Sequence, residues 1–294
     1  MPSLRLSLLL LVPGAAAAQQ IPAYVPVNPV LASRSALYAQ PVILPYDGWR
    51  PAITIDYSNA VEPGNADGGR KYLFAAELLQ VDLWLRRALS PSWFVLGNLA
   101  LRRAHDGFLD RFLNGYHDLI GIPVPARNQR PPDSYAWRLE LPDGNYDIAR
   151  QRAFIGDLRL GVGHRIGRGQ VVASVTLPTA TNGVTQWSRG TIGTAVGATF
   201  RVVDQPRLAV ELGAQAGWTP AHGELAAYQR ELFAAASAST RWRGIGRQAL
   251  FATVFTQAAN WKATGFTALE SPEITLDFGG LLYLGANWPA LQIG

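Results

Sequence analysis

Apolar and polar residues alternate with a period of two along most of the chain, and this pattern restricts the fold more than any other feature. In residues 207–218, for example, Leu208, Val210 and Leu212 share one parity, whereas Glu211, glycines and other small or polar residues occupy the other. Successive side chains of a strand point to opposite faces, so each such segment has one apolar and one polar environment. The pattern predicts eleven strands, at residues 51–58, 79–86, 93–102, 154–165, 171–177, 192–202, 207–218, 236–243, 249–259, 274–282 and 290–294.

The links between these expected strands are alternately short and long. Short links, such as residues 89–91, 166–169 and 204–206, connect consecutive expected strands. Long links, such as residues 59–70 and 105–152, alternate with them. An outer-membrane β-barrel has tight periplasmic turns and longer surface loops, and a soluble β-sandwich has no reason to keep such an order. We therefore expect an antiparallel transmembrane β-barrel in a bacterial outer membrane. Both parities are mixed in residues 249–259, so the facing of that strand cannot be assigned.

The tryptophans agree with a membrane-spanning barrel. Aromatic residues gather at the two lipid–water interfaces of such barrels, which correspond to the strand ends. Six of the nine tryptophans lie at or near expected strand ends, and we expect them to form these girdles: Trp49, Trp93, Trp218, Trp242, Trp261 and Trp288.

Residues 1–18 have the features of a secretory signal peptide. Arg5 is followed by a short apolar run and by the alanines of residues 15–18, which give a cleavage pattern with Gln19 as the first mature residue. The apolar run is too short to cross a bilayer as a helix. We expect residues 19–48 to lie either in the lumen as a plug or in the periplasm, and residues 49–294 to form the barrel.

The count of eleven strands predicts an incomplete barrel. Bacterial single-chain barrels have even strand numbers, so we expect the complete barrel to have twelve strands and the chain to be truncated at its C-terminus. The strand Pro51–Ser58 would then lack its closing partner, and the barrel would gape there.

The longest loop has structure of its own. Apolar residues recur at helical spacing between Gly107 and Ile120, which predicts an amphipathic helix. This helix could lie on the outer leaflet, fold into the barrel mouth or pack on neighbouring loops. Residues 135–141 and 146–148 flank Pro142-Asp143-Gly144, which predicts a β-hairpin above the membrane.

Short segments of the middle of the chain resemble a known family. They are HDGFLD at residues 105–110, YHD at 116–118, GIP at 121–123, GDLRL at 156–160 and TLPT at 176–179. Together they resemble an uncharacterised proteobacterial family that is catalogued as a domain of unknown function and looks like an outer-membrane β-barrel. The resemblance implies the fold and a chain longer by roughly thirty residues. It implies no activity, cofactor or catalytic residue.

Charged residues recur on the parity opposite to the apolar face, and arginines outnumber acids among them. In a wide barrel such groups line water and set selectivity, whereas in a small one they pair and fill the interior. We expect the lumen-lining set to be Asp56, Asp82, Arg86, Arg102, Asp157, Arg159, Arg201, Arg207, Glu211, Arg241, Arg243 and Asp277.

These residues favour a narrow passive channel or uptake port for an unidentified small solute, with mild anion preference. A structural or adhesive surface barrel that acts through its long loops is the first alternative. A lipid hydrolase is the second and less favoured one, because no His lies near a Ser in a suitable pattern. No catalytic residue and no cofactor is expected. A metal site is not expected either, because His105 and His117 are twelve residues apart, a spacing that does not place them on one helix face.

The expected partners are outer-membrane lipid with lipopolysaccharide, and the general barrel-assembly machinery. The chain has a net charge of +5 but no clustered basic run, so nucleic acid is not expected as a partner.

Overall fold

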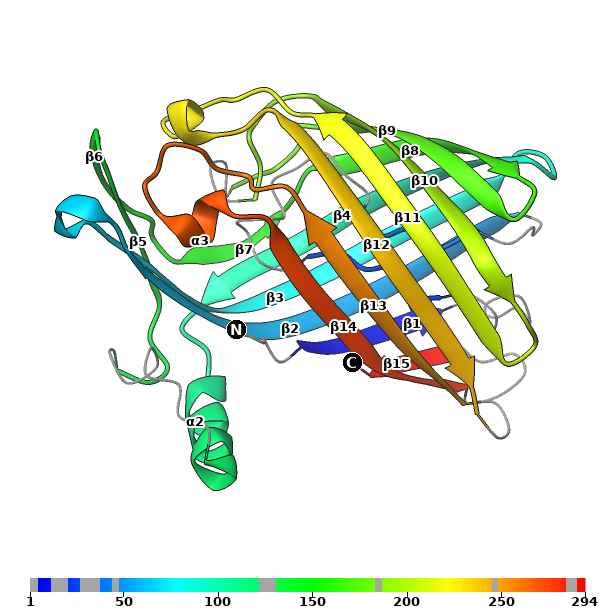
Figure 1. Ribbon diagram of the computed structural model, residues 1–294, viewed down its shortest axis with the longest axis horizontal. Coiled ribbons are helices and arrows are strands. Elements are labelled where there is room, and N and C mark those ends of the chain that lie inside the picture. Colours follow the sequence, from blue (N-terminus) through cyan, green and yellow to red (C-terminus); the bar gives the residue numbers. More distant parts are fainter. Residues whose placement is uncertain are drawn as a thin grey trace.

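The strands form one antiparallel sheet that curls into a barrel. The computed structural model describes residues 5–11, 21–26, 38–43, 48–121, 131–182, 187–244, 248–283 and 290–293. Within these residues, twelve strands follow one another along the sheet (Figure 1): β1 (Arg5–Leu11), β2 (Trp49–Asn65), β3 (Lys71–Ala88), β4 (Trp93–His105), β8 (Leu158–Ile166), β9 (Gly169–Leu177), β10 (Gly193–Asp204), β11 (Leu208–Trp218), β12 (Leu232–Arg243), β13 (Ala249–Gln257), β14 (Glu273–Tyr283) and β15 (Ala290–Ile293).

Three further strands and the helices lie at the end of the barrel that carries the long links, which we call the long-loop end; the opposite end is the short-turn end. The strands β5 (Ala136–Leu141) and β6 (Gly144–Asp147) form the expected hairpin, which pairs with β3, and β7 (Gln151–Ile155) pairs with β4. The expected helix is present as α2 (Leu109–Ile120), and α3 (Thr267–Glu270) lies before β14. Two 3-10 turns complete the elements, η2 (Asp67–Gly69) and η4 (Ala226–Tyr228). Among the described residues, no helix is both long enough and apolar enough to cross a membrane.

The predicted barrel fold is confirmed. All eleven expected strands are present, as β2 to β4 and β8 to β15. The strand expected at 154–165 is interrupted at Gly156 and Asp157, which separate β7 from β8. Along β4 the register therefore jumps from a pair with Ile155 to a pair with Arg159.

The faces of the strands follow the predicted parity. On β11, Leu212 is 50% exposed on the outside, whereas Glu211 is 1% exposed on the inside. The structure also assigns β13, whose facing the sequence left open. Leu250 points outward and Phe255 points inward. Because Phe255 is large and apolar, the contrast between inner and outer faces that marks the other strands is weak in β13.

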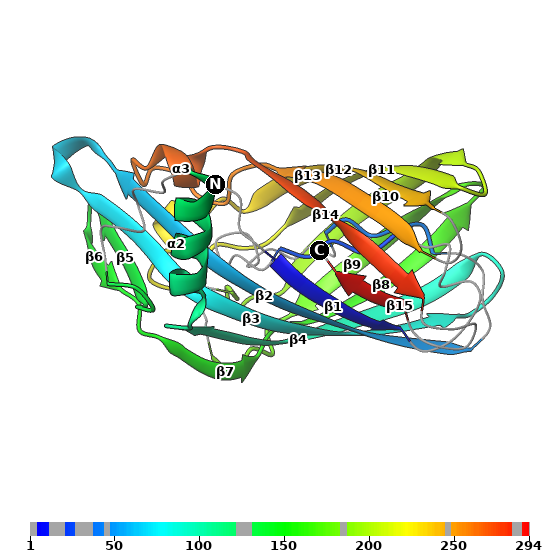
Figure 2. The same ribbon diagram turned by 90° about the horizontal axis from the view of Figure 1, so that it is seen from below.

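The edge of the sheet differs from expectation. Residues 52–58 of β2 do not lack a partner, because they pair with β1, which lies within the expected signal peptide. In the described part of the chain, the hydrogen-bonded order begins at β1 and ends at β15, so the sheet is not closed between these two strands. Among the described residues, the edge without a hydrogen-bonded partner therefore belongs to β1 and not to β2, although β1 (dark blue) and β15 (dark red) lie side by side in Figure 2.

Candidate functional site: the barrel interior

The interior of the barrel holds most of the charged residues that the parity predicts there. The inward-facing members that are at most 9% exposed are Asp56, Asp82, Arg102, Asp157, Arg159, Arg201, Glu211, Arg241 and Asp277. Arg86 and Arg243 are partly exposed near the short-turn end. The prediction is wrong for Arg207, whose side chain is exposed in the turn between β10 and β11, because β11 begins only at Leu208.

A polar network lies on the inner face of β3 and β4. The carboxylate of Asp82 accepts hydrogen bonds from Gln80 and from Nδ2 of Asn98, the latter at 2.9 Å. Nε of Arg102 donates to Oε1 of Gln80 at 2.8 Å. All four side chains are buried. Nη1 and Nη2 of Arg102, however, have no hydrogen-bond acceptor among the described residues.

A second guanidinium and a second carboxylate belong to the same region. Arg102 interacts electrostatically with Arg159, the second residue of β8, and with Asp157, which directly precedes β8. The guanidinium of Arg159 lies over the ring of Tyr38, 5.9 Å from its centroid. Oδ1 of Asp157 accepts a hydrogen bond from the amide of Ala180 at 3.1 Å. The interior between β4 and β8 thus brings two arginines beside two aspartates.

The charges on β10 and β11 are fully paired. Nε and Nη2 of Arg201 donate to Oε1 of Glu211 at 2.9 and 2.7 Å. Nη1 of Arg201 also contacts Oδ1 of Asp204 at 3.2 Å. The other oxygen of Glu211 accepts a hydrogen bond from the amide of Val42 at 2.9 Å, so this pair also binds the N-terminal segment.

That segment lies inside the barrel wherever the structure describes it, at residues 21–26 and 38–43. Gln170 of β9 accepts from the amide of Ile43 at 2.8 Å and donates to the carbonyl of Pro41 at 2.7 Å. Thr199 donates to the carbonyl of Gln40 at 2.8 Å. The sequence leaves open whether residues 19–48 lie in the lumen or in the periplasm. These hydrogen bonds to inward-facing side chains place the described residues of the segment in the lumen.

Aromatic contacts support this placement. The ring centroid of Phe255 on β13 lies 5.1 Å from that of Tyr24 and 6.1 Å from that of Tyr38. These tyrosines are at most 4% exposed. The inward Phe255 therefore packs on the N-terminal segment, which explains its apolar character.

A narrow space remains between this segment and the wall formed by β9 to β12. Small inward residues such as Ser174, Gly197 and Gly213 line it opposite Tyr38. Its volume of about 30 Å³ has room for roughly two water molecules. Beside β9 to β12, the described residues of the N-terminal segment therefore leave room for little more than water.

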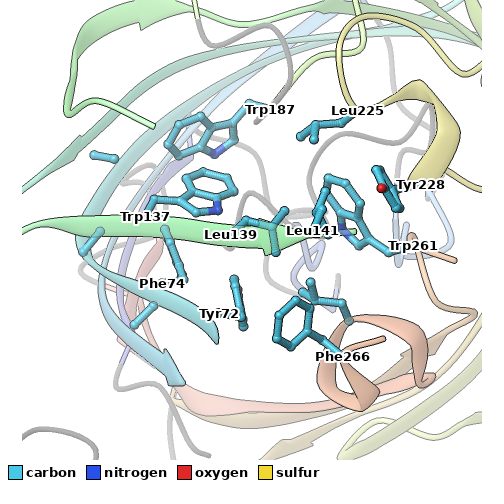
Figure 3. Close-up of a cluster of buried hydrophobic side chains, with 14 of the residues drawn as sticks. Tyr72, Phe74, Trp137, Leu139, Leu141, Trp187, Leu225, Tyr228, Trp261 and Phe266 are labelled. Carbon is cyan, nitrogen blue, oxygen red and sulfur yellow. The ribbon is translucent and has the colours of Figure 1, made fainter. Parts of the chain in front are cut away.

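The long-loop end is covered by a cluster of apolar side chains, which we call the mouth cluster (Figure 3). It comprises residues from β3, the β5–β6 hairpin and three long loops: Tyr72, Phe74, Trp137, Leu139, Leu141, Trp187, Leu225, Tyr228, Trp261 and Phe266. Tyr228 ties the hairpin to the loop after β11, because its hydroxyl donates to Oδ1 of Asp143 at 2.6 Å. Burial raises the pKa of this tyrosine, and the neighbouring carboxylate raises it further.

The mouth cluster corrects one predicted girdle residue. Trp261 is 6% exposed and lies in the mouth cluster, not at the lipid surface, because its loop folds inward over the barrel. The other girdle residues that the structure describes are 44–54% exposed at strand ends: Trp49, Trp93, Trp218 and Trp242. Trp288 lies outside the described residues.

Several interior residues were not selected from the sequence, although parity could have found them. Gln80 and Asn98 share the inward parity of Asp82 and Arg102, but uncharged amides are a weaker signal than charges. Gln170 has inward parity too, but its partner is 127 residues away, which no local pattern reveals. Of the histidines, His105 accepts a hydrogen bond at Nδ1 from the amide of Gly107 at 3.0 Å. Within the described ranges, no three His, Asp or Glu side chains are grouped so as to hold a metal ion.

Comparison with solved structures agrees with the barrel geometry. The chain is similar to the crystal structure of the COG4313 outer membrane channel from Pseudomonas putida F1, with a TM-score of 0.50 and 13% identity over 85% of this chain and 93% of that chain. The fold is that of an outer-membrane β-barrel. The chain is more distantly similar to LpxR from Salmonella typhimurium, with a TM-score of 0.46 and 10% identity over 81% of this chain and 85% of that chain.

No family model and no curated protein matches the sequence. The resemblance to a family of unknown function therefore stays a prediction. At 13% identity, the similarity to the Pseudomonas channel concerns the fold alone.

Proposed function

We propose that the protein is a narrow outer-membrane channel for small hydrophilic solutes, with a preference for anions. The observation that carries this proposal is the state of Arg102 inside the barrel. Its side chain is 1% exposed, yet Nη1 and Nη2 have no hydrogen-bond acceptor among the described residues. A buried guanidinium in a dry interior would cost several kcal/mol without full pairing. Water or an anionic solute in the lumen would meet these donors.

The surrounding charges support the same function. Arg102 lies in the field of a second arginine, Arg159, and of Asp82 and Asp157, and the N–H donors of Arg102 that lack an acceptor in the described part of the chain are the groups at this level that would meet an anion. Charged side chains that line a pore set its selectivity. The similar Pseudomonas protein is an outer membrane channel, which agrees with the proposal, although fold does not determine function.

The mouth cluster favours a second function, a closed barrel that acts through its long loops. Its apolar side chains cover the long-loop end, and the N-terminal segment narrows the lumen below. In this case the inward charges would only fill the interior.

Conductance in planar bilayers separates the two functions. We expect the unmodified protein to form small channels that pass chloride better than potassium, and Arg102→Gln to lower that preference several-fold. Arg103→Gln is the matched control, because Arg103 is the next residue of β4 and is exposed on the outer face. No conductance, or equal effects of the two substitutions, would contradict the channel.

A further inference from the structure

We propose that α2 is a membrane-surface helix that inserts its apolar face into the outer leaflet beside the barrel. The helix lies outside the barrel wall at the long-loop end (Figures 1 and 2). Both views show it across the long axis of the barrel and not along it, so its axis lies in the plane of the membrane. This inference is independent of whether the barrel conducts.

Most apolar side chains of α2 are exposed and point away from the barrel. The buried residues of the helix are Asp110, which is 3% exposed, and Leu113, which is 4% exposed. The apolar residues recur at intervals of three and four, which places them on one stripe. They are Phe112 (63% exposed), Tyr116 (48%), Leu119 (84%) and Ile120 (42%), whereas Phe108, before the helix, stacks on the ring of Tyr57 of β2.

Polar contacts fix this orientation. Nδ2 of Asn59 on β2 donates to Oδ1 of Asp110 at 2.9 Å, and the amide of Asp133 donates to the other carboxylate oxygen at 2.8 Å. The amide of Leu109 at the start of the helix donates to the carboxylate of Glu77 on β3. The hydroxyl of Tyr57 donates to the same carboxylate. The helix is thus held by its polar side, which keeps its apolar stripe outward.

The attachment points lie at the outer edge of the lipid-facing surface. Asn59 pairs with Glu77, and Glu77 pairs with His105 at the end of β4, so all three are at one level. Asn59 is ten residues along β2 from Trp49, which is at the short-turn end. A transmembrane strand of about ten residues spans the apolar band of an outer membrane. The helix therefore lies at the outer lipid–water interface.

The neighbouring surface of the barrel indicates what covers the apolar stripe of α2. The outer face of the barrel below the helix is apolar and exposed, for example at Leu83 (45%), Leu85 (44%) and Leu101 (43%). The stripe continues this lipid-facing surface. Amphipathic helices with aromatic and leucine residues on one face bind at the boundary of headgroups and acyl chains. Lipid of the outer leaflet therefore covers the stripe.

Single-cysteine labelling tests this inference, because the chain contains no cysteine of its own. Leu119→Cys and Phe112→Cys would each carry an environment-sensitive fluorophore in the full-length protein, reconstituted in phosphatidylethanolamine–phosphatidylglycerol vesicles. Both positions are exposed, so neither substitution removes a buried contact. Asp118→Cys, on the polar flank of the same helix, is the matched control.

We expect brominated lipid to quench the labels at residues 112 and 119 several-fold more than the label at residue 118, and aqueous iodide to show the opposite order. Equal access of iodide to all three labels would overturn the inference, because the stripe would then face water. Protection of the labels at 112 and 119 from both quenchers would also overturn it, because a second copy or another protein would then cover the stripe.

Discussion

Removal of the side chain that binds the N-terminal segment should open the lumen. Gln170 joins this segment to the wall through the amide of Ile43 and the carbonyl of Pro41, and the side chains of Gln170 and Ile43 are at most 2% exposed. Gln170→Leu would leave both backbone groups without their partner. Each buried polar group that loses its partner costs about 1–3 kcal/mol.

The size of the effect follows from these two bonds. Water in the lumen would replace part of the loss, so we expect the docked state to be weakened by about 3 kcal/mol, near the lower end of the summed range. Every 1.4 kcal/mol is a factor of about ten. The undocked population should therefore rise roughly 100-fold, and with it the frequency of large-conductance openings in planar-bilayer recordings.

Gln215→Leu is the matched control for this experiment. Gln215 also faces the lumen, where it lines the narrow space, but it forms no hydrogen bond to the described part of the N-terminal segment. It should leave the frequency of openings near that of the unmodified protein. Hydrogen exchange at residues 38–43 reports docking directly. Faster exchange in Gln170→Leu without more openings would show that this segment does not close the lumen. Unchanged exchange would refute the expected loss of about 3 kcal/mol in the docking of residues 38–43.

Three further substitutions test other parts of the structure. Trp137→Ala removes a buried member of the mouth cluster, should cost about 3–5 kcal/mol locally, and should speed cleavage of the loops by external protease, whereas the exposed Trp242→Ala should not. Glu211→Leu leaves the buried Arg201 with only the half-exposed Asp204 and should lower the free energy of unfolding by about 3–5 kcal/mol; the double variant Arg201→Leu with Glu211→Leu should lose less in urea unfolding. Gly107→Ala should displace α2, because φ of Gly107 is +64° and a Cβ would lie 1.8 Å from Cδ of Glu77. Lipid quenching of the label at residue 119 should then fall, whereas Gly115→Ala, with open space around it, should stabilise the helix by about 0.5–1 kcal/mol.

The strands and their facing were predictable because both depend on local physics. A strand between lipid and lumen must alternate, so Leu212 and Glu211 reveal their faces without knowledge of any neighbour. The lengths of the links likewise reveal which end of the barrel carries the turns. Phe255 was unpredictable because its inward facing depends on Tyr24 and Tyr38, more than 200 residues earlier in the chain.

The interior site was predictable to a similar degree. Parity placed Arg102 and Asp82 inside, but it could not show which charges pair. Arg201 meets Glu211 through the register of β10 and β11, whereas Nη1 and Nη2 of Arg102 have no acceptor among the described residues. The prediction that Trp261 faces lipid was wrong for the same reason. A tryptophan at a strand end can face lipid or fold inward, and its contacts with the other loops determine which of the two it does.

The N-terminal residues 5–11 have two incompatible roles, as part of the expected signal peptide and as β1. In the structure they form seven residue pairs with residues 52–58 of β2. Cleavage before Gln19 would remove β1 and expose backbone groups of β2 to lipid, where each unpaired group costs several kcal/mol. The apolar run and the alanines before Gln19 are nevertheless what a signal peptidase recognises, so we predict that protein extracted from outer membranes has an intact mass that begins at Gln19. A mass that retains residues 5–11 would refute the signal peptide and show that β1 is a lasting strand of the barrel.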